Sequence, residues 1–516
     1  MNKFLDKLLK YYDLSLRDYE KLTAEVTKEN LPTAEAFFNF ESFISRIEKA
    51  IASDENVVIY GDYDADGILA TSILKYAFLK RGKDVFTMIP SRYKDGYGLN
   101  TNVVEKFSKR AINLIITVDN GINQHDAIDL ANELGIDVLV SDHHELSETL
   151  PNAIAILHPE LSNLVRLNSC GAYMALVISY GMLGYYDDYL ISLAAIATLA
   201  DMMPLIDRNR TLVRLAIKAT NDHQYFPLVK LNDSTFFDET SMSMKIAPKI
   251  NALGRLSQNY ESNVLVEYFT TTDVKRHYDI SEYIEKVYKK RKSMSRGEEL
   301  SSEELKNPVI TLITDELEGV LGLIAQNYML EHNKPAFIFT ESSEDPSLLK
   351  GSVRSKSGFN VVDAFSHLEH LILTSGGHKE AGGLTIRKQD FIVFKEALNK
   401  YAKNYPLITQ DEKYLDVTLD EITKENYALI KNLSPFGHKF RAPLLRVAPI
   451  TNVKYLYSRD GKHIITPLES GVKLIGFSLA EESKNALNIG FTATFAESEF
   501  RGRRSIDLII KEFFTA

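Results

Sequence analysis

Three short clusters of acidic and histidine residues follow directly behind apolar runs of this sequence. They are Asp62-Tyr63-Asp64-Ala65-Asp66, Asp119-Asn120-Gly121 and Asp142-His143-His144. Packing so much negative charge together is costly unless a cation neutralises it, and carboxylates are ligands for hard divalent metals. A histidine adds a nitrogen ligand, which favours Mn²⁺-like ions over a purely oxygen-bound Mg²⁺. The clusters therefore predict a metal-dependent enzyme.

The apolar runs before the clusters are expected to place them at one edge of a sheet. Residues 57–60, 114–118 and 138–140 are typical of buried strands, and helix-like sequence follows each of them. This alternation predicts a parallel sheet, in which ligands bind outside the carboxyl ends of the strands. Asp201, which follows a buried helix predicted over 190–199, is a further candidate ligand.

A pair of metal ions bound by these clusters would suit phosphate chemistry. Two ions about 4 Å apart can activate a water, hold an attacked phosphoryl group and stabilise the departing oxygen. Asp119, at the end of the second strand, could bridge two such ions. No Gly-x-x-x-x-Gly-Lys-Ser/Thr pattern follows the first strand, so a phosphate-cleaving hydrolase fits better than a nucleotide-driven motor. One acidic loop alone would be read as a turn or a helix cap, but three in succession favour a metal site.

The composition is that of a globular chain with several domains. At 516 residues it exceeds one ordinary core, and its 25% charged residues are an ordinary share. No apolar stretch approaches the roughly 18 residues that cross a bilayer, and no signal peptide is visible, so we expect no membrane partner. The net charge of −10 leaves local basic grooves open. The single cysteine, Cys170, excludes an internal disulfide framework and fits a reducing cytoplasm.

The rest of the chain predicts three further parts. Residues 272–305 are polar and long, and they predict an extended connecting helix. A second, smaller α/β unit starts at residue 309, and the last hundred residues alternate short β-like runs with turns, as a small β-barrel would. The expected domains are a catalytic parallel-sheet domain with an N-terminal extension, a connecting segment, a smaller α/β substrate-binding domain and a single-strand-binding barrel, at residues 1–220, 221–305, 306–405 and 406–516.

Several residues outside the acidic clusters could bind phosphate or bases. The glycine-rich run 375–383 leaves backbone amides free to hold phosphate, and His378 within it can donate a hydrogen bond. Arg354 offers a forked donor, and Arg255 could reach the same cleft. In the β-rich tail, aromatic and basic side chains suit the stacking by which small barrels bind single strands, although we expect Phe477 to fill the barrel interior.

Together these segments resemble the DHH phosphoesterase superfamily, and within it most closely the RecJ family of single-strand-specific exonucleases. The segments that resemble the motifs of the catalytic domain are 60–67, 117–121, 141–144 and 199–204. Those that resemble the DHH-associated domain are 351–355 and 376–383, and those that resemble the start and end of the OB-fold are 435–437 and 500–505. The resemblance runs from about residue 40 through nearly the whole chain, in the family's domain order.

The resemblance implies roles for particular residues. One or two Mn²⁺ or Mg²⁺ ions would be bound by Asp64, Asp66, Asp119, His143 and Asp201. Asp119 would bridge the ions, His144 would contact the scissile phosphate, and Asp142 completes the set expected to act in catalysis. The residues expected to bind the substrate are Arg255, Arg354, Ser355, Gly376, Gly377, His378, Tyr457, Arg501 and Arg503.

Two segments depart from the pattern of the superfamily. Many members carry a histidine four residues before the first metal-binding aspartate, and here that position is Tyr60. The departure implies a weaker first metal site, or one filled only when substrate is bound. The run 168–172 is also less rich in Gly and Val than is usual, with no clear consequence.

The leading hypothesis is a metal-dependent exonuclease that hydrolyses single-stranded DNA from the 5′ end to mononucleotides, in repair and recombination. Its 5′ polarity comes from the resemblance only. An oligonucleotide or cyclic-dinucleotide phosphodiesterase is the second hypothesis, and a non-catalytic DHH replication scaffold is the third. The expected partners of this α/β enzyme are single-stranded DNA, a helicase and a single-strand-binding protein. We expect a cytoplasmic monomer.

Overall fold

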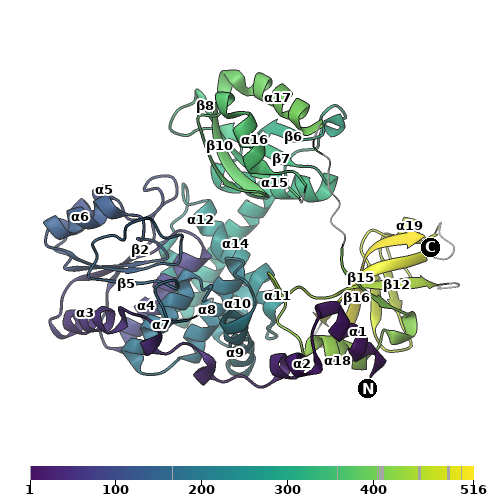
Figure 1. Cartoon of the computed structure of the whole chain (residues 1–516), viewed down its shortest axis with the longest axis horizontal. Coiled ribbons are helices and arrows are strands. Elements are labelled where there is room, and N and C mark those ends of the chain that lie inside the picture. The colour runs from purple at the N-terminus through teal and green to yellow at the C-terminus, as the bar shows by residue number, and fades with distance from the viewer. Residues whose placement is uncertain are drawn as a thin grey trace. The chain divides into compact units, whose positions relative to one another are not determined.

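The computed structural model describes residues 2–164, 167–356, 358–403, 405, 412–450, 455–484, 489–500 and 503–515. The chain forms two compact units, and each of them is assembled from stretches that are far apart in the sequence (Figure 1). The first unit comprises Met1–Ile44, Leu157–Lys245 and Glu412–Ala516, and the second comprises Ser45–Ile156 and Ile246–Asp411. None of the described helices has the length and apolar character needed to span a membrane.

A five-stranded sheet in the order β2-β1-β3-β4-β5 organises the first part of the second unit. Its strands are β1 (Val57–Tyr60), β2 (Phe86–Met88), β3 (Leu114–Val118), β4 (Asp137–Ser141) and β5 (Ala155–Leu157). Strand β1 pairs in parallel with β2 and β3, and β3 pairs in parallel with β4. Strands β1 and β3 are buried along their whole length, and apart from Thr117 their residues are apolar or aromatic rather than alternating with polar ones. The predicted parallel sheet is confirmed.

Helices connect these strands and continue the unit. They are α3 (Phe40–Ala52), α4 (Ala65–Lys80), α5 (Thr101–Ser108), α6 (His125–Glu133), α12 (Ala247–Arg255), α13 (Asn263–Thr270) and α14 (Val274–Met294). Helix α14 is the predicted connecting helix, but it is shorter than the predicted 272–305. It ends before Gly297, which adopts a left-handed φ of +73° beside the Tyr328 hydroxyl.

A second, mixed sheet completes this unit, in the order β6-β7-β8-β10-β9. Its elements are β6 (Ile310–Ile313), α15 (Glu318–His332), β7 (Ala336–Glu341), β8 (Leu348–Arg354), α16 (Val361–His367), β9 (Thr374–His378), β10 (Ala381–Arg387) and α17 (Phe391–Lys403). Its core is rich in phenylalanine, with Phe337, Phe339 and Phe394 fully buried. Strand β9 lies at an edge of the sheet and is exposed along its length.

The first unit joins a helical layer to a six-stranded sheet. Its helices are α1 (Lys3–Tyr12), α2 (Leu16–Thr23), α7 (Gly171–Leu183), α8 (Asp188–Ala200), α9 (Asp207–His223), α10 (Phe226–Asn232), α11 (Glu239–Ser241), α18 (Lys424–Lys431) and α19 (Ala480–Lys484). Its strands are β11 (Tyr414–Val417), β12 (Leu444–Ile450), β13 (Ile464–Pro467), β14 (Lys473–Gly476), β15 (Ile489–Phe500) and β16 (Arg503–Thr515), in the order β11-β12-β15-β16-β14-β13.

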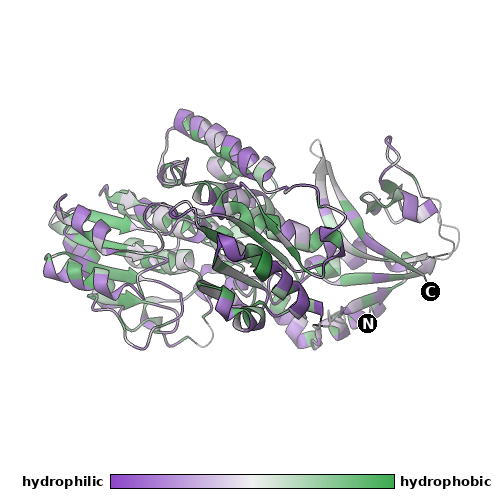
Figure 2. Ribbon diagram, turned by 90° about the horizontal axis from the view of Figure 1, so that it is seen from above, coloured by the Kyte–Doolittle hydropathy of each residue, from purple (hydrophilic) through white to green (hydrophobic). Residues whose placement is uncertain are grey.

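Helix α1 packs against this C-terminal sheet. Phe4 and Leu8 share a core with Val447 and Phe491, and the Lys7 ammonium lies 2.7 Å from the Glu421 carboxylate. These residues of the N-terminal segment therefore belong to the core of the C-terminal part. Figure 2 shows the general pattern, with hydrophobic colour on the strands and hydrophilic colour on the outer helices and loops.

Candidate active site

The first acidic cluster is fixed by the start of α4. Asp64 is the N-cap of this helix, and its carboxylate accepts hydrogen bonds from the backbone N–H groups of Asp66 (2.9 Å) and Gly67 (3.1 Å). These bonds satisfy helix donors that lack intrahelical partners. The Ala65 N–H donates to the Asn251 amide oxygen at 2.8 Å, which ties the cluster to α12. Asp64 is therefore a helix cap, and its capping hydrogen bonds also fix the orientation of its carboxylate.

The second cluster turns sharply after β3. Asp119 adopts a left-handed φ of 62°, and its N–H donates to the Ser141 carbonyl at 3.0 Å. The buried Asn120 amide donates to the carbonyls of Tyr60 (3.2 Å) and Val118 (2.9 Å). These bonds lock the carboxyl ends of β1, β3 and β4 together, so the strained Asp119 backbone is held in place.

The predicted convergence of side chains occurs within the second unit. Carboxylate oxygens of Asp62, Asp64 and Asp119 all lie within 4.8 Å of one another, and so do single ligand atoms of Asp119, His143 and His144. The His143 Nε2 atom lies 3.0 Å from Asp119 Oδ1 and 3.5 Å from Asp66 Oδ2. Asp119 belongs to both groups, so its position suits a bridging ligand.

The electrostatics of this cluster are strongly unfavourable for negative charge. Burial raises the pKa of Asp62 to about 7, with a further contribution from Asp64. Burial and then the charge of Asp66 raise the pKa of Asp64, and burial and then Asp66 raise that of Asp119 well above its ordinary value. Buried carboxyls that repel one another keep their protons unless a cation replaces them. The two donor sets therefore fit divalent metal ions. Asp62, Asp64 and Asp119 offer oxygen atoms alone, whereas the group of Asp119, His143 and His144 offers oxygen with imidazole nitrogen.

His144 lies at the accessible side of the cluster. Its Nδ1 is 2.7 Å from Asp142 Oδ1, and this carboxylate also accepts from the backbone N–H groups of His143 and His144. Burial alone would raise the pKa of Asp142, but the hydrogen bond and charge of His144 lower it. The Tyr97 hydroxyl lies 3.1 Å from Nδ1 and 3.2 Å from Nε2 of the same ring. The imidazole is therefore held from two sides while remaining partly exposed.

Tyr60 points its hydroxyl into the protein. This hydroxyl donates to the Gly98 carbonyl at 3.1 Å, and the side chain is completely buried against Phe107. Burial raises the pKa of the phenol, with smaller effects from Asp95 and Asp62. Tyr60 therefore supports the loop that carries Tyr97 and supplies no ligand atom to the groups above.

A group of guanidinium side chains gathers beside α12. Burial, followed by the positive charges of Arg92, Arg291 and Arg354, lowers the pKa of Arg255 to about 10. Arg255 Nη1 donates to the Gly319 carbonyl at 3.1 Å, and Arg92 lies over the Tyr63 ring at 5.1 Å. The three guanidinium groups that lower the pKa of Arg255 form, together with it, a site for an anion such as phosphate.

The glycine-rich segment forms the edge hairpin β9–β10. Gly376 has open space where a Cβ would lie, so its backbone is accessible, while Gly377 adopts a left-handed φ of 146°. A cavity of about 420 Å³ lies over this hairpin, β8 and the first turn of α15, with Arg92, Glu318 and Lys350 among its lining residues. His378 is exposed. The Ser355 hydroxyl is buried and donates to the Phe359 carbonyl at 2.9 Å, so its bond is internal to the domain.

The remaining predicted residues belong to the first unit. Asp201 is the C-cap of α8, directly after the predicted buried helix. Tyr457 is 39% exposed, and its hydroxyl lies 3.1 Å from the Ser483 hydroxyl. Arg501 and the side chain of Arg503 lie outside the described residues. The prediction that Phe477 fills the barrel interior is wrong, because it is 63% exposed beyond the end of β14.

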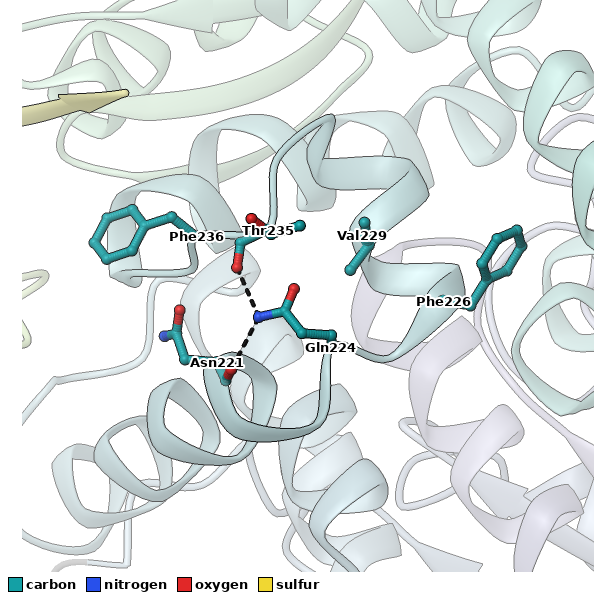
Figure 3. A pocket seen from close by; sticks show the side chains of 6 residues that line it. All are labelled: Asn221, Gln224, Phe226, Val229, Thr235 and Phe236. Atoms are coloured by element: carbon teal, nitrogen blue, oxygen red, sulfur yellow. Dashed lines mark hydrogen bonds between the residues drawn. The ribbon is translucent and has the colours of Figure 1, made fainter. Parts of the chain in front are cut away.

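A larger cavity in the first unit lacks this chemistry. It has a volume of about 580 Å³ and is lined by Asn221, Gln224, Phe226, Val229, Thr235 and Phe236 (Figure 3). The Gln224 amide donates to the carbonyls of Asn221 (2.9 Å) and Thr235 (2.8 Å), so it serves the local fold. No acid, base or nucleophile is among its lining residues. The cavity is therefore not a candidate for catalysis.

Sequence reasoning missed several residues of the candidate site, chiefly Tyr97, Arg92, Arg291 and Asn251. A signal for Tyr97 was present, because Gly96 and Gly98 flank it and both adopt left-handed φ values, of 77° and 74°. Two such glycines around one aromatic residue mark a specially shaped loop. Asp62 belongs to the first acidic cluster of the sequence but is not among the ligands predicted from it.

Family models match three successive parts of the chain. The N-terminal domain of the DHH family matches residues 56–200, the DHHA1 domain matches 306–404 and the RecJ OB domain matches 415–512. A RecJ single-stranded-DNA-specific exonuclease from Bacillus subtilis is 30% identical over 522 residues, covering 95% of this chain and 66% of that protein. The corresponding protein from Haemophilus influenzae is 27% identical, covering 94% of this chain and 92% of that protein.

Solved structures of the same family share the fold. RecJ from Thermus thermophilus in complex with Mn²⁺ aligns with a TM-score of 0.81 and 24% identity, over 99% of this chain and 76% of that one. An exonuclease RecJ bound to manganese aligns with a TM-score of 0.59 and 26% identity, over 74% of this chain and 96% of that one. With its DHH, DHHA1 and RecJ OB domains in this order, the chain belongs to the RecJ family of DHH proteins.

Proposed function

We propose that this chain is a metal-dependent exonuclease that hydrolyses phosphodiester bonds of single-stranded DNA from the 5′ end, releasing mononucleotides in repair and recombination. One observation carries the proposal: carboxylates and imidazoles of three separate strand ends meet within ligand distance in a member of the RecJ family. The similar proteins bear the name single-stranded-DNA-specific exonuclease. The proposed domains have limits after residues 220, 305 and 405, with α1 packed on the last of them.

Mn²⁺ or Mg²⁺, as one or two ions, is the proposed cofactor. The proposed ligands are Asp64, Asp66, Asp119, His143 and Asp201, with Asp62 added from the geometry of the cluster. Metal of this kind, when bound, supplies an activated water and neutralises charge on the attacked phosphate. Burial, followed by repulsion between the carboxylates, raises the pKa values of Asp62, Asp64 and Asp119, and this supports the assignment because a bound cation would favour the charged forms.

His144 is the proposed contact to the scissile phosphate. Its hydrogen bond to the Asp142 carboxylate fixes Nδ1 as a donor and leaves Nε2 to act on the substrate. Tyr97 restricts rotation of the same ring. In this arrangement Asp142 orients the imidazole, and Asp119 would hold the metal that neutralises charge on the phosphate.

The single strand is proposed to be held by charge and stacking. Arg255, Arg354 and the hairpin that contains Gly376, Gly377 and His378 are suited to phosphates, and Arg92 joins them in the structure. Ser355 supports this hairpin, since its N–H donates to the Glu380 carbonyl. In the OB domain the exposed Tyr457 is suited to stacking on bases, and Arg501 and Arg503 remain proposed backbone contacts.

The protein partners, the oligomeric state and the cellular location are further proposals. We propose a helicase and a single-strand-binding protein as partners of this member of the RecJ family. We also propose a monomeric state and a cytoplasmic location. Sedimentation of the purified protein and co-purification with each candidate partner would test them separately.

Digestion of end-labelled single strands, blocked at the 5′ or the 3′ end, tests the activity and its polarity. With Mn²⁺ we expect mononucleotide release from strands whose 5′ end is free, and no digestion of blunt duplex. Release only from the 3′ end would refute the polarity. A protein without activity in both Mn²⁺ and Mg²⁺ would refute the enzyme and favour a scaffold.

A further inference from the structure

The loop after α8 carries a proposed metal ligand and has an unusual backbone. Asp201 is followed by Met202, which adopts a left-handed φ of 54° although its side chain is large and 65% exposed. For a residue other than glycine this conformation is strained. Strain of this kind persists only where surrounding bonds hold it. The Met203 N–H supplies one such bond, to the Thr198 carbonyl at 3.1 Å.

A turn formed by residues 434–440, within the part that matches the RecJ OB domain, makes two further hydrogen bonds to this loop. His438 Nδ1 donates to the Met202 carbonyl at 2.7 Å, and the Leu205 N–H donates back to the His438 carbonyl at 2.8 Å. Gly437 approaches so closely that a Cβ there would lie 3.0 Å from Leu205. The turn therefore binds the loop at the carbonyl of its strained residue and at a backbone N–H three residues later.

The turn is itself held rigidly within the first unit. Arg210 of α9 donates to the carbonyls of Pro435 (2.8 Å) and Ser434 (3.1 Å), and its guanidinium lies 4.7 Å from the Phe440 ring. The Glu239 carboxylate accepts from the Phe436 N–H at 2.9 Å. Since the turn is fixed from α9 and α11, the bond from His438 can set the position of the loop rather than follow it.

We propose that His438 is a positioning residue for the Asp201 carboxylate, acting through the backbone of Met202. The inference rests on the proposed function, because it takes Asp201 as a metal ligand. Partners that orient a ligand typically change metal affinity about 10- to 100-fold when they are removed. His438 acts through a peptide unit, so we expect the lower end of this range.

The test compares three variants by Mn²⁺ binding, measured from the free-ion paramagnetic resonance signal, and by nuclease activity against Mn²⁺ concentration. His438→Leu removes the donor, and about 10-fold weaker binding is expected, with kcat restored at saturating Mn²⁺. His438→Asn keeps an N–H at nearly the same place and should restore binding to within twofold. Lys439→Asn, in the same turn at a left-handed φ of 66°, is the matched control and should bind as the wild type does.

A second set of variants keeps the test decisive if His438→Leu is unstable. Met202→Gly removes the strain, so the loss caused by His438→Leu should shrink in that background. Wild-type Mn²⁺ affinity in His438→Leu, or equal loss in His438→Leu and His438→Asn, would overturn the inference. Unchanged binding and activity in Asp201→Asn would instead remove Asp201 from the metal site and so refute that part of the proposed function.

Discussion

The acidic strand-end site and the exposed aromatic side chains of the OB domain differ in how each would hold nucleic acid. At the strand ends, Asp66 and Asp119 are buried, and this burial, followed by repulsion from Asp66, raises the pKa of Asp119. In the OB domain, Tyr457 and Phe477 expose their rings to solvent. In the first region negative charge is unfavourable until a cation binds, whereas the second region presents aromatic surface on which any base could stack. Catalysis should therefore depend on the first region, and the binding of long strands should depend on the second.

The largest effect is expected from the carboxylate shared by both groups of ligand atoms. Asp119→Asn removes a bridging ligand, so kcat should fall about 10³-fold or more, in line with the loss of a group central to charge stabilisation. Binding of single strands should change less than threefold. Because the variant also removes a repelled carboxyl, its melting temperature without metal should equal or exceed that of the wild type. A variant that loses both folding and DNA binding would break the contrast between the regions.

The second expected effect is a pH dependence of stability confined to the acidic site. The folded-state pKa of Asp62 is about 7, above the ordinary 3.8, so its stabilising contribution is full below about pH 4 and is lost as pH rises through 7. Without metal, unfolding free energy should therefore fall from pH 5 to 8, by up to about 1.4 kcal/mol per pH unit for each such carboxyl. Mn²⁺ should raise the melting temperature more at pH 8 than at pH 6.

Melting curves with and without Mn²⁺ check this prediction. Asp62→Asn should flatten the slope seen without metal, because it removes one of the repelled carboxyls. A wild-type protein whose metal-free stability is constant or rises over this range would contradict the electrostatic account.

A smaller effect is expected for the hydroxyl that touches His144. Tyr97→Phe loses one hydrogen bond, worth about 0.5–1.5 kcal/mol, so kcat should fall roughly 2- to 10-fold with KM for DNA nearly constant. Tyr185→Phe, at a 51% exposed tyrosine of the other unit, is the control. Equal kinetics of the two variants would show that Tyr97 does not hold the imidazole.

The smallest effect is expected in the OB domain, and only for long substrates. Tyr457→Ala and Phe477→Ala each remove one possible stacking surface, worth about 1–3 kcal/mol per base. On strands of about 30 nucleotides or more KM should rise about threefold or more, while kcat and the hydrolysis of trinucleotides stay constant. If trinucleotide hydrolysis fell equally, these aromatics would be serving the fold.

The sequence was sufficient for the sheet and for the meeting of its acidic ends. Largely apolar strands such as 114–118 are buried on both faces of a parallel sheet, so the polar residues that follow them must gather at one edge. The sequence was insufficient where the position of a side chain depends on which face of a strand it occupies or on a contact with a distant residue. Phe477 follows a strand in which Leu474 is buried and Lys473 is not, so it continues the outer face. Tyr97 depends on a loop held by the Tyr60 hydroxyl, a tertiary bond that no local pattern reports.

The packing of α1 on the OB domain has a consequence for how the protein is made. Lys7 and Glu421, which form an ion pair, are 414 residues apart, and Phe4 and Leu8 complete a core with strands near the other end of the chain. During synthesis α1 must wait with an apolar face uncovered until those strands emerge. Contacts of such high sequence separation fold slowly and expose the intermediate to aggregation. A bulky N-terminal fusion, or removal of residues 1–12, should lower the soluble yield before it alters catalysis.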